Sequence, residues 1–153
     1  MITLKPVGVV VGGRAEPIDD DWGGIEAIIR LNAARFGPDA VTGLSAFSHL
    51  VVVFQFHLVD PTDARTGARR PRGNREWPEV GMFAQRARMR PNRLGVSTCR
   101  LLGVEGLDLH VQGLDAIDGS PVLDVKPYMR EFESPGDDVR QPSWSTELMQ
   151  GCY

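Results

Sequence analysis

The sequence contains little cysteine, almost no lysine and no long hydrophobic run. Its two cysteines, Cys99 and Cys152, are too few for a zinc site, and we expect both to be free thiols in a reducing compartment. The longest apolar run, residues 50–59, is interrupted by Gln55 and His57 and is too short to cross a bilayer. The N-terminus lacks the design of a signal peptide. We therefore expect a cytoplasmic protein with no membrane segment and no metal.

Common nucleotide-site and hydrolase motifs are also missing. No G-x-G-x-x-G follows a predicted strand, which excludes a Rossmann dinucleotide site. The sequence has no G-x-x-x-x-G-K-[ST] phosphate loop, no H-E-x-x-H and no G-x-S-x-G. These absences exclude the most familiar nucleotide-binding and hydrolytic architectures.

Positive charge is concentrated in the middle of an acidic chain. The formal net charge is -3, which argues against a purely electrostatic nucleic-acid binder. Residues 65–93 nevertheless carry nine arginines against two acids, Glu76 and Glu79. Because guanidinium groups match the geometry of carboxylates and phosphates, this segment predicts an anion site. A solvated arginine loop explains the composition equally well. The nine are Arg65, Arg69, Arg70, Arg72, Arg75, Arg86, Arg88, Arg90 and Arg93.

Short apolar runs alternate with Gly, Pro and Asp-Gly sequences, a rhythm typical of β-rich domains. Both faces of residues 50–59 are mostly apolar, so we expect a central strand there. Residues 25–31 alternate as a strand does, although a short helix fits the same apolar stripe. We predict a mainly β fold, a small antiparallel β-barrel or strongly curved sheet with little helix. The other predicted strands are residues 2–11, 80–84, 96–104, 107–117 and 121–125.

The connections between these strands follow from turn chemistry. Residues 60–78 have Pro and Gly without periodicity and predict a loop, and residues 39–47 predict a loop with one helical turn. Asp118-Gly119-Ser120 predicts the tight turn of a hairpin between residues 107–117 and 121–125. We expect one domain over residues 1–132, with residues 133–153 as a tail that is extended or docked on a partner.

Candidate functional side chains gather in residues 81–97 and 114–128. In the first segment Pro91 stiffens a turn, and Gly95 permits close approach of a ligand. In the second, Asp124 and Lys126 share one face of a strand and can pair. Asp118 is more typical of a turn than of a catalytic acid or base.

Two histidines lie on one face of the predicted central strand. A lone histidine in a β-core is more often structural than catalytic. At ~3.3 Å per residue His49 and His57 are about 26 Å apart, so they cannot act together at one point of one subunit.

Three ordered blocks carry a resemblance to a known family. They are L-x-A-F-S-H-L at residues 44–50, G-x-F-A-x-R-x-x-x-R-P-N-x-x-G-x-S at residues 81–97, and G-L-D-x-x-D-G-[ST]-P-V-x-D-x-K-P-Y at residues 113–128. In order and spacing they resemble the TrmO/YaeB-like (TsaA) family. The resemblance implies a small β-barrel methyltransferase that binds S-adenosylmethionine near a homodimer interface. It further implies N6-methylation of N6-threonylcarbamoyladenosine beside the tRNA anticodon.

The resemblance also implies where the cofactor binds. Arg90 is expected to hold the methionine carboxylate through two hydrogen bonds, and Trp22 to stack on adenine. The segment around Trp22 departs from the R-Q-P-G-like run of the family, although its glycines suit close backbone approach. The implied cofactor residues are Trp22, Gly23, Gly24, Phe56, His57, Phe83, Arg86, Arg90, Pro91, Asn92, Arg100, Leu101, Asp118, Gly119, Ser120 and Pro121.

The acceptor side of the reaction is assigned by the same reasoning. A urea-type nitrogen is weakly basic, so a proton acceptor is expected, and His49, Asp115 and Asp118 are the candidates. The C-terminal extension of longer members is missing, which leaves two alternatives: a methyltransferase of a small molecule, or a module that binds S-adenosylmethionine or a partner without turnover. The implied tRNA-contacting residues are Arg69, Arg70, Arg72, Arg88, Lys126 and Tyr128.

Overall fold

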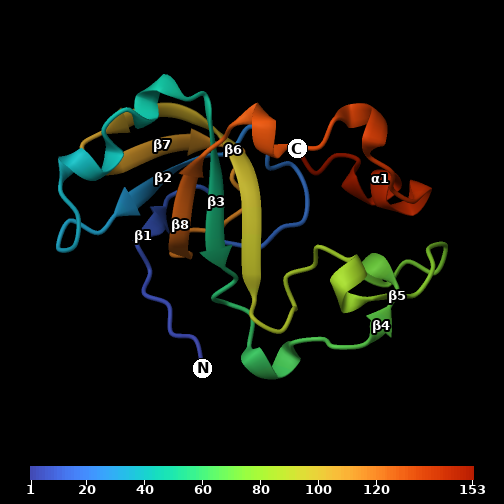
Figure 1. Cartoon of the computed structure of the whole chain (residues 1–153). Helices are drawn as coiled ribbons and strands as arrows, with labels where there is room; N and C mark the ends of the chain where they lie inside the picture. Colours follow the sequence, from blue (N-terminus) through green and yellow to red (C-terminus); the bar gives the residue numbers. More distant parts are fainter.

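Six strands pair antiparallel into a closed barrel in the order β1-β2-β7-β6-β3-β8 (Figure 1). The structure is a computed structural model that describes all residues 1–153. Closure gives every strand two hydrogen-bonded neighbours, so the barrel has no open edge. The predicted mainly β barrel is confirmed. The strands are β1 (Gly8–Val11), β2 (Glu26–Leu31), β3 (His49–Gln55), β6 (Leu94–Glu105), β7 (Asp108–Gln112) and β8 (Pro121–Pro127).

Strand β3 lies between β6 and β8 and turns Leu50, Val52 and Phe54 into the barrel. Its other residues, from His49 to Gln55, are only partly buried, as period-two geometry requires. The predicted central strand is therefore confirmed, and it ends at Gln55 rather than at residue 59. The buried core is completed by Val10, Ala27, Ile29, Cys99, Leu101, Leu109, Val111, Leu114, Ala116 and Val122.

Strand β6 carries one polar residue into the barrel. Its pairing with β3 sets Ser97 opposite Val52 and Cys99 opposite Leu50, and both β6 side chains are buried. The alternate residues Val96 and Arg100 are exposed on the outer face. Ser97 therefore needs a hydrogen-bond partner inside the barrel.

The predicted hairpin at Asp118-Gly119-Ser120 is wrong. Strands β7 and β8 do not pair: β7 lies between β2 and β6, and β8 lies between β1 and β3. The turn chemistry was correctly predicted, since Ser120 N donates to Ile117 O and Gly119 has φ +84°. The turn instead carries the chain around the barrel wall between two strands with different neighbours. The actual hairpin joins β6 to β7 at Gly106, whose φ is +60°.

Other predicted elements are shorter or more structured than expected. Of residues 25–31, Glu26–Leu31 form strand β2 and not the alternative helix, and the N-terminal strand is confined to Gly8–Val11. Residues 39–47 contain two 3-10 helices, η1 (Pro38–Val41) and η2 (Leu44–Ala46).

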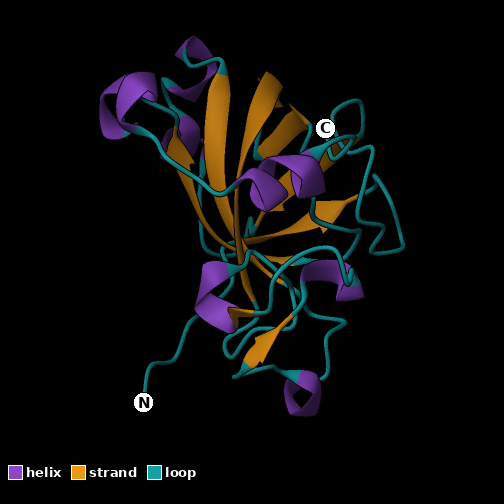
Figure 2. Cartoon of the chain, turned by 90° about the vertical axis from the view of Figure 1, so that its right-hand side faces the viewer, coloured by secondary structure: helices purple, strands orange, loops and turns teal.

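Residues 60–93, here called the arginine lobe, form a separate small unit beside the barrel (Figure 2). The lobe contains the two-stranded sheet β4 (Ala68–Arg69) and β5 (Val80–Gly81). The buried Gln85 amide joins them, because its Nε2 donates to Arg69 O and Val80 O, both at 3.1 Å. The predicted loop is therefore partly ordered by backbone contacts. Its 3-10 helices are η3 (Pro61–Asp63), η4 (Pro71–Gly73) and η5 (Met82–Ala84).

After β8 the chain forms η6 (Arg130–Phe132), η7 (Gly136–Asp138) and one α-helix, α1 (Ser143–Met149). Residues 143–153, here called the strap, then return to the barrel (Figure 1). None of the helices has the length and apolar character that a bilayer span requires.

Gly95 on β6 provides a direct test of barrel packing. A Cβ there would lie 2.5 Å from the Phe54 ring, whereas a Cβ at Gly103 on the same strand would meet nothing within 4 Å. Gly95→Ala should therefore lower the free energy of unfolding by about 1–3 kcal/mol through overpacking, measured by urea denaturation. Gly103→Ala, the matched control, should be neutral or slightly stabilising. If Gly95→Ala is as stable as the parent, the described packing is wrong. The same holds if adding Phe54→Leu to Gly95→Ala recovers none of the lost free energy of unfolding.

Candidate functional site

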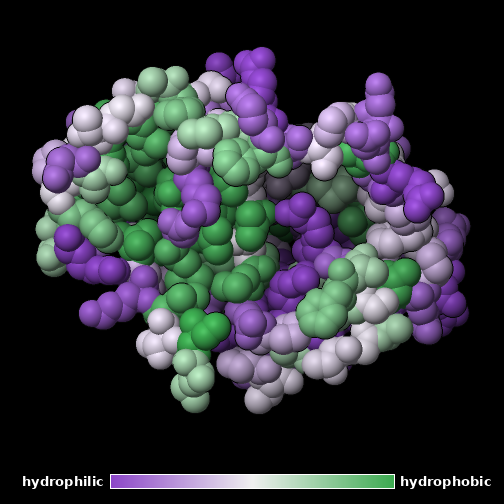
Figure 3. Space-filling model, in the orientation of Figure 1, coloured by the Kyte–Doolittle hydropathy of each residue, from purple (hydrophilic) through white to green (hydrophobic).

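A cleft of about 230 Å³ lies where the barrel meets the arginine lobe. The molecular surface is visibly hollowed between the barrel and the lobe (Figure 3). Apolar side chains make most of the cleft wall, and a few polar groups project into it. This combination is typical of small-molecule sites. The lining residues are Pro17, Ile18, Trp22, Phe54, Phe56, His57, Leu58, Val59, Asp60, Asp63, Arg88, Met89, Asp115, Ala116, Ile117 and Ser120.

The end of strand β3 supplies an aromatic wall of the cleft. Phe54 and Phe56 pack edge to face with ring centroids 5.2 Å apart, and His57 follows them directly. Such a surface can cover the flat face of a purine.

His57 contains the one buried side-chain nitrogen or oxygen in the chain without a hydrogen-bond partner, its Nδ1. The other ring nitrogen, Nε2, lies toward Gly119, where a Cβ would be only 3.4 Å away. Leaving a buried polar atom unpaired typically costs ~1–3 kcal/mol of folding free energy. An unpaired atom of this kind therefore persists where another interaction, such as binding of a ligand, offsets the cost. Because His57 lines the cleft, a ligand polar group is the natural partner for Nδ1.

Asp115 supplies the negative charge of the inner wall. Its Oδ1 accepts a hydrogen bond from Ser97 Oγ, the buried hydroxyl that β6 turns into the barrel. Burial, and then the charge of Asp115, raise the pKa of the nearby Cys99 thiol to about 12, so this thiol stays protonated and unreactive. A carboxylate beside an apolar cleft can neutralise a cation or accept a proton.

Trp22 lies in the cleft wall but is held tightly by its neighbours. It is buried, and its Nε1 donates to Ile18 O at 2.7 Å. The Arg14 guanidinium lies 4.8 Å from the ring centroid, which gives a cation–π contact. The Trp22 side chain is thus a rigid part of the cleft wall. At Gly23 the close backbone approach is made by Tyr153, whose backbone carbon lies 2.8 Å from a Cβ built there, and Gly24 is exposed.

The Asp118-Gly119-Ser120-Pro121 turn is divided between cleft and framework. Ser120 is buried and lines the cleft. Asp118 is exposed, and its Oδ1 accepts from Gly12 N at 2.8 Å. This carboxylate thus has a structural contact, although with the backbone after β1 and not with the N–H groups of its own turn. Pro121 begins β8 and pairs with Val9.

Four of the candidate residues lie on the outer face of the barrel, away from the cleft. His49 and Arg100 are register partners there, and the Tyr128 ring lies 6.1 Å from the His49 ring. Lys126 pairs with Asp124 at 2.9 Å, as the sequence suggested. Leu101 instead faces the core. The cleft of this chain therefore brings together Trp22, Phe56, His57, Arg88, Asp115 and Ser120, and not the His49 group.

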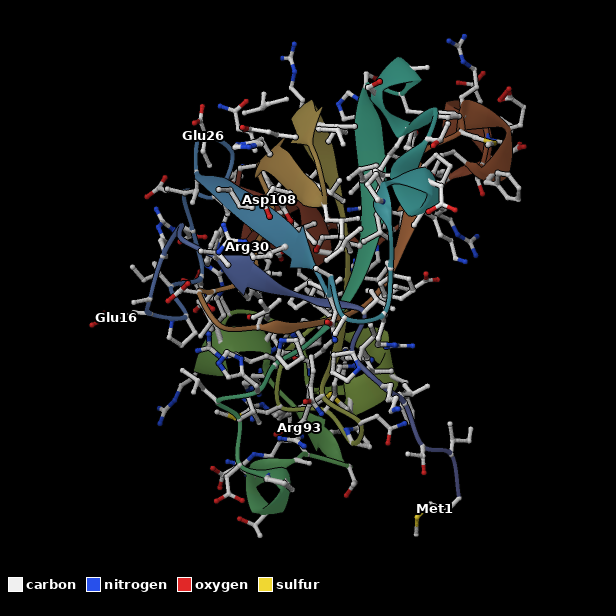
Figure 4. All side chains as sticks on the ribbon, turned by 90° about the vertical axis from the view of Figure 1, so that its left-hand side faces the viewer. Met1, Glu16, Glu26, Arg30, Arg93 and Asp108 are labelled. Carbon is white, nitrogen blue, oxygen red and sulfur yellow. The ribbon has the colours of Figure 1, made fainter.

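Most arginines of the lobe bind the chain itself. Arg90 donates to Gln85 O at 2.8 Å and to Ala87 O at 3.2 Å, so it braces the turn that contains Pro91 and Asn92. Arg93, labelled in Figure 4, donates to Val59 O at 2.8 Å. The remaining contacts are Arg70 to Trp77 O, Arg72 to Asp20 at 3.1 Å, Arg86 to Val96 O at 2.8 Å, and Arg88 to Pro17 O at 2.6 Å.

Three lobe arginines, Arg65, Arg69 and Arg75, make no side-chain hydrogen bond or ion pair within the chain. Phe83 is also exposed. No group of three His, Cys, Asp or Glu side chains is arranged to hold a metal ion.

Sequence reasoning missed several cleft residues. Ile18 and Met89 carry no motif signal, and only the three-dimensional approach of their segments reveals them. Ser97 does not line the cleft but bonds to Asp115, which does; it had a signal as the last residue of the G-x-F-A block, but this partnership depends on the barrel register.

Comparison with known proteins identifies the family to which this fold belongs. The model of the tRNA-methyltransferase O N-terminal domain matches residues 17–134. The chain belongs to this family, which confirms the resemblance found in the sequence. Over 92% of this chain, the crystal structure of TrmO from Pseudomonas aeruginosa superposes with a TM-score of 0.72 and 28% identity, and 61% of that chain is covered.

Two relatives differ greatly in length from one another. A probable S-adenosyl-L-methionine-binding protein of Methanothermobacter thermautotrophicus is 45% identical over 139 residues, which are 88% of this chain and 96% of that protein. The tRNA (adenine(37)-N6)-methyltransferase of Mus musculus is 36% identical over 107 residues, 70% of this chain and 24% of that protein. This chain thus spans about a quarter of the mouse protein and nearly all of the archaeal one.

Proposed function

We propose that the protein is an S-adenosylmethionine-dependent methyltransferase that acts in the cytoplasm. Its proposed acceptor is N6 of N6-threonylcarbamoyladenosine beside the tRNA anticodon. Support comes from membership of the tRNA-methyltransferase O family and from relatives named as S-adenosylmethionine-binding proteins and tRNA (adenine(37)-N6)-methyltransferases. The archaeal relative, named only for binding, supports the alternative of a binding module or of a smaller acceptor.

The observation that carries the proposal is the cleft with its unpaired His57 Nδ1 and its Asp115 carboxylate. The donor set fits the cofactor: Phe54, Phe56 and Trp22 offer apolar faces for the adenine, and His57 offers a polar contact. When bound, S-adenosylmethionine supplies an electrophilic methyl group. The protein's part is to orient the acceptor nitrogen in line with it and to exclude water.

Asp115 is the proton acceptor that the geometry favours among the three candidates. It lines the cleft, whereas Asp118 is engaged with Gly12 N. His49 stands at the far end of β3, about 20 Å from Gln55 at ~3.3 Å per residue. We therefore assign the proton from the acceptor nitrogen to the Asp115 carboxylate.

Calorimetry with S-adenosylmethionine tests the site. His57→Phe should weaken binding at least about tenfold, ~1.4 kcal/mol, because the ligand loses its polar partner. The same variant should be as stable as the parent or more so, because an unpaired buried nitrogen is removed. Asp115→Asn should keep cofactor affinity within a few-fold but slow methyl transfer by about 100-fold or more.

The acceptor is decided by methyl transfer to threonylcarbamoylated tRNA, with unmodified tRNA as the control. Binding of the cofactor with transfer only to the modified tRNA supports the proposal. Binding without transfer to either tRNA would favour the alternative of a binding module or a small acceptor. No detectable binding by the parent protein would refute the cofactor assignment.

For tRNA, Arg65, Arg69 and Arg75 are the proposed phosphate contacts of the arginine lobe. They lack partners within the chain, whereas Arg70 and Arg72 are occupied by the fold. Of the tRNA-contacting arginines expected from the sequence, this choice keeps Arg69, and it adds Arg65 and Arg75. The other expected tRNA contacts lie in two separate places: Arg88 lines the cleft, and Lys126 and Tyr128 lie on the outer barrel face. Their proposed role in binding tRNA therefore requires an RNA that reaches both surfaces.

Neutralising Arg65, Arg69 and Arg75 to glutamine should weaken tRNA binding and reduce its salt slope. Each lost phosphate contact should remove roughly 0.7–0.9 from the slope of log affinity against log salt. Cofactor affinity should not change. The control variant, Arg130→Gln with Arg140→Gln, removes two exposed charges outside the lobe and should leave the slope unchanged. An unaltered slope in the triple variant would exclude the lobe as the platform.

We also propose a homodimer with the cleft near its interface. Val53 and Val96 are register partners on the outer barrel face, Val96 is 47% exposed, and Leu102 lies on the same strand. Figure 3 shows hydrophobic residues gathered over this side of the barrel. The cleft is also smaller than the ~300–1,000 Å³ usual for ligand pockets. A second copy packed beside it would add further wall and enclose more of the ligand.

Light scattering at micromolar concentration tests this assembly. The parent should have the mass of two chains, and Val96→Arg should have the mass of one, because the apolar patch then carries a charge. Val139→Arg, at an exposed valine outside the patch, is the control and should remain dimeric. A monomeric parent that binds the cofactor would contradict the proposal.

A further inference from the structure

One side of the cleft is a segment without regular secondary structure. Residues 17–22, here called the wall segment, lie between strands β1 and β2, and Pro17, Ile18 and Trp22 line the cleft. The segment pairs with no barrel strand, so contacts with other parts of the chain must hold it in place. The lobe supplies one such contact, because Arg88 Nη1 donates to Pro17 O at 2.6 Å.

The strap supplies backbone partners for the wall segment. Asp21 N donates to Gly151 O and Trp22 N donates to Cys152 O, both at 2.8 Å. Cys152 is only 8% exposed, and its Sγ lies 3.6 Å from Asp19 O. Two successive backbone hydrogen bonds and a buried side chain define a docked segment and not a loosely attached tail.

Two further contacts fix the strap, one at the barrel and one at the lobe. The Tyr153 backbone carbon lies 2.8 Å from a Cβ built on Gly23, so the docked strap requires glycine there. At the lobe, Trp77 Nε1 donates to Glu147 Oε2 at 2.8 Å. Helix α1 lies over the arginine lobe, and the chain then returns to the barrel near β6 (Figure 1). The strap therefore bridges the two parts of the molecule between which the cleft lies.

The backbone of Asp21 gives docking of the strap a consequence for the cleft. Asp21 has φ +63°, in the left-handed region that residues other than glycine rarely adopt. Such a conformation persists where the surroundings impose it, and Asp21 is held on both sides. Its N–H binds Gly151 O, and its O accepts from Arg14 Nη2 at 2.8 Å. The turn at Asp21 sets the direction of Trp22, whose buried ring donates from Nε1 to Ile18 O at 2.7 Å.

We propose that the strap positions the Trp22 ring in the cleft wall, and that docking of the strap and binding of S-adenosylmethionine are therefore coupled. The inference rests on the proposed function, in which Trp22 offers an apolar face to the adenine. When the strap is released, Asp21 loses one of the two contacts that impose its left-handed backbone, and the ring loses its fixed place. Because coupling is reciprocal, a bound cofactor holds the strap docked by the same factor. The strap lies outside residues 17–134, which match the family.

Hydrogen exchange measures the positioning without any ligand. The reporters are the backbone N–H groups of Asp21 and Trp22, which bind the strap, and the indole N–H of Trp22, which binds Ile18 O. All of them should exchange slowly in the parent. Gly23→Ala should release the strap by displacing the Tyr153 backbone, and overpacking of this kind should make all the reporters exchange at least about fivefold faster.

Gly151→Ala releases the strap from its other side. Gly151 has φ +75°, so a side chain strains the backbone there although a Cβ would meet nothing within 4 Å. This variant should accelerate exchange of the same reporters. Gly24→Ala, whose Cβ also meets nothing within 4 Å, is the matched control and should exchange like the parent. If the indole N–H of Trp22 stays as protected as in the parent in both strap variants, the positioning role is wrong.

Coupling to the ligand is measured by the reaction of Cys152 with a thiol reagent. Release of the strap exposes Cys152, whereas Cys99 is buried in the barrel core and should react only on unfolding. Saturating S-adenosylmethionine should slow labelling of parent Cys152 at least about fivefold, the lower end of typical coupling between sites. L-methionine, which has no adenine to meet the Trp22 ring, should leave the rate unchanged. In Gln150→Ala, at an exposed residue of the strap, the cofactor should slow labelling as in the parent.

These measurements distinguish failure of the coupling from failure of the proposed function. A parent that does not bind S-adenosylmethionine in calorimetry would refute the proposed function, and hydrogen exchange would still decide whether the strap positions Trp22. A parent that binds the cofactor, with Cys152 labelled at the same rate in its presence and absence, would overturn the coupling and leave the proposed function intact.

Discussion

Closure of the barrel is the constraint on which the other features depend. Because each strand has a partner on both sides, the register between β3 and β6 decides which side chains face inward. That register places Ser97 inside the barrel, where its hydroxyl meets Asp115, and places His49 and Arg100 outside. The Arg30–Asp108 ion pair between β2 and β7 also lies outside, on a face away from the cleft (Figure 4). The strand register of the closed barrel thus separates the cleft from the outer polar groups.

The rhythm of short apolar runs and turn residues was enough to predict the barrel class, and the apolar run at residues 50–59 was enough to predict the central strand. The same logic failed at Asp118-Gly119-Ser120, because turn chemistry is local and does not state which strands pair. The hairpin at Gly106 was missed, because Glu105-Gly106-Leu107-Asp108 is only a weak turn signal unless the pairing of β6 with β7 is known. Local sequence therefore identified where the chain turns, and only closure of the barrel determined which neighbours it meets.

Prediction of the site was limited for a different physical reason. The residues implied by the resemblance include several that line the cleft, such as Phe56, His57 and Ser120. The arginines within those blocks were expected to bind ligands, yet Arg86 and Arg90 donate to backbone carbonyls. A guanidinium has five donors and serves backbone oxygens as readily as phosphates, so residue type alone does not separate these uses. The docking of residues 143–153 could not be predicted, because the contacts that hold them to Asp21, Trp22 and Trp77 are distant in sequence.

The position of the tryptophans follows from the strap and gives the protein a spectroscopic property. The chain has three tryptophans, and each belongs to the strap or touches it. Trp144 lies in α1, Trp77 is hydrogen-bonded to Glu147, and Trp22 donates its backbone N–H to Cys152. No tryptophan lies elsewhere in the barrel to contribute a constant background. The intrinsic tryptophan fluorescence of this protein is therefore sensitive to how one short segment sits on the remainder of the chain.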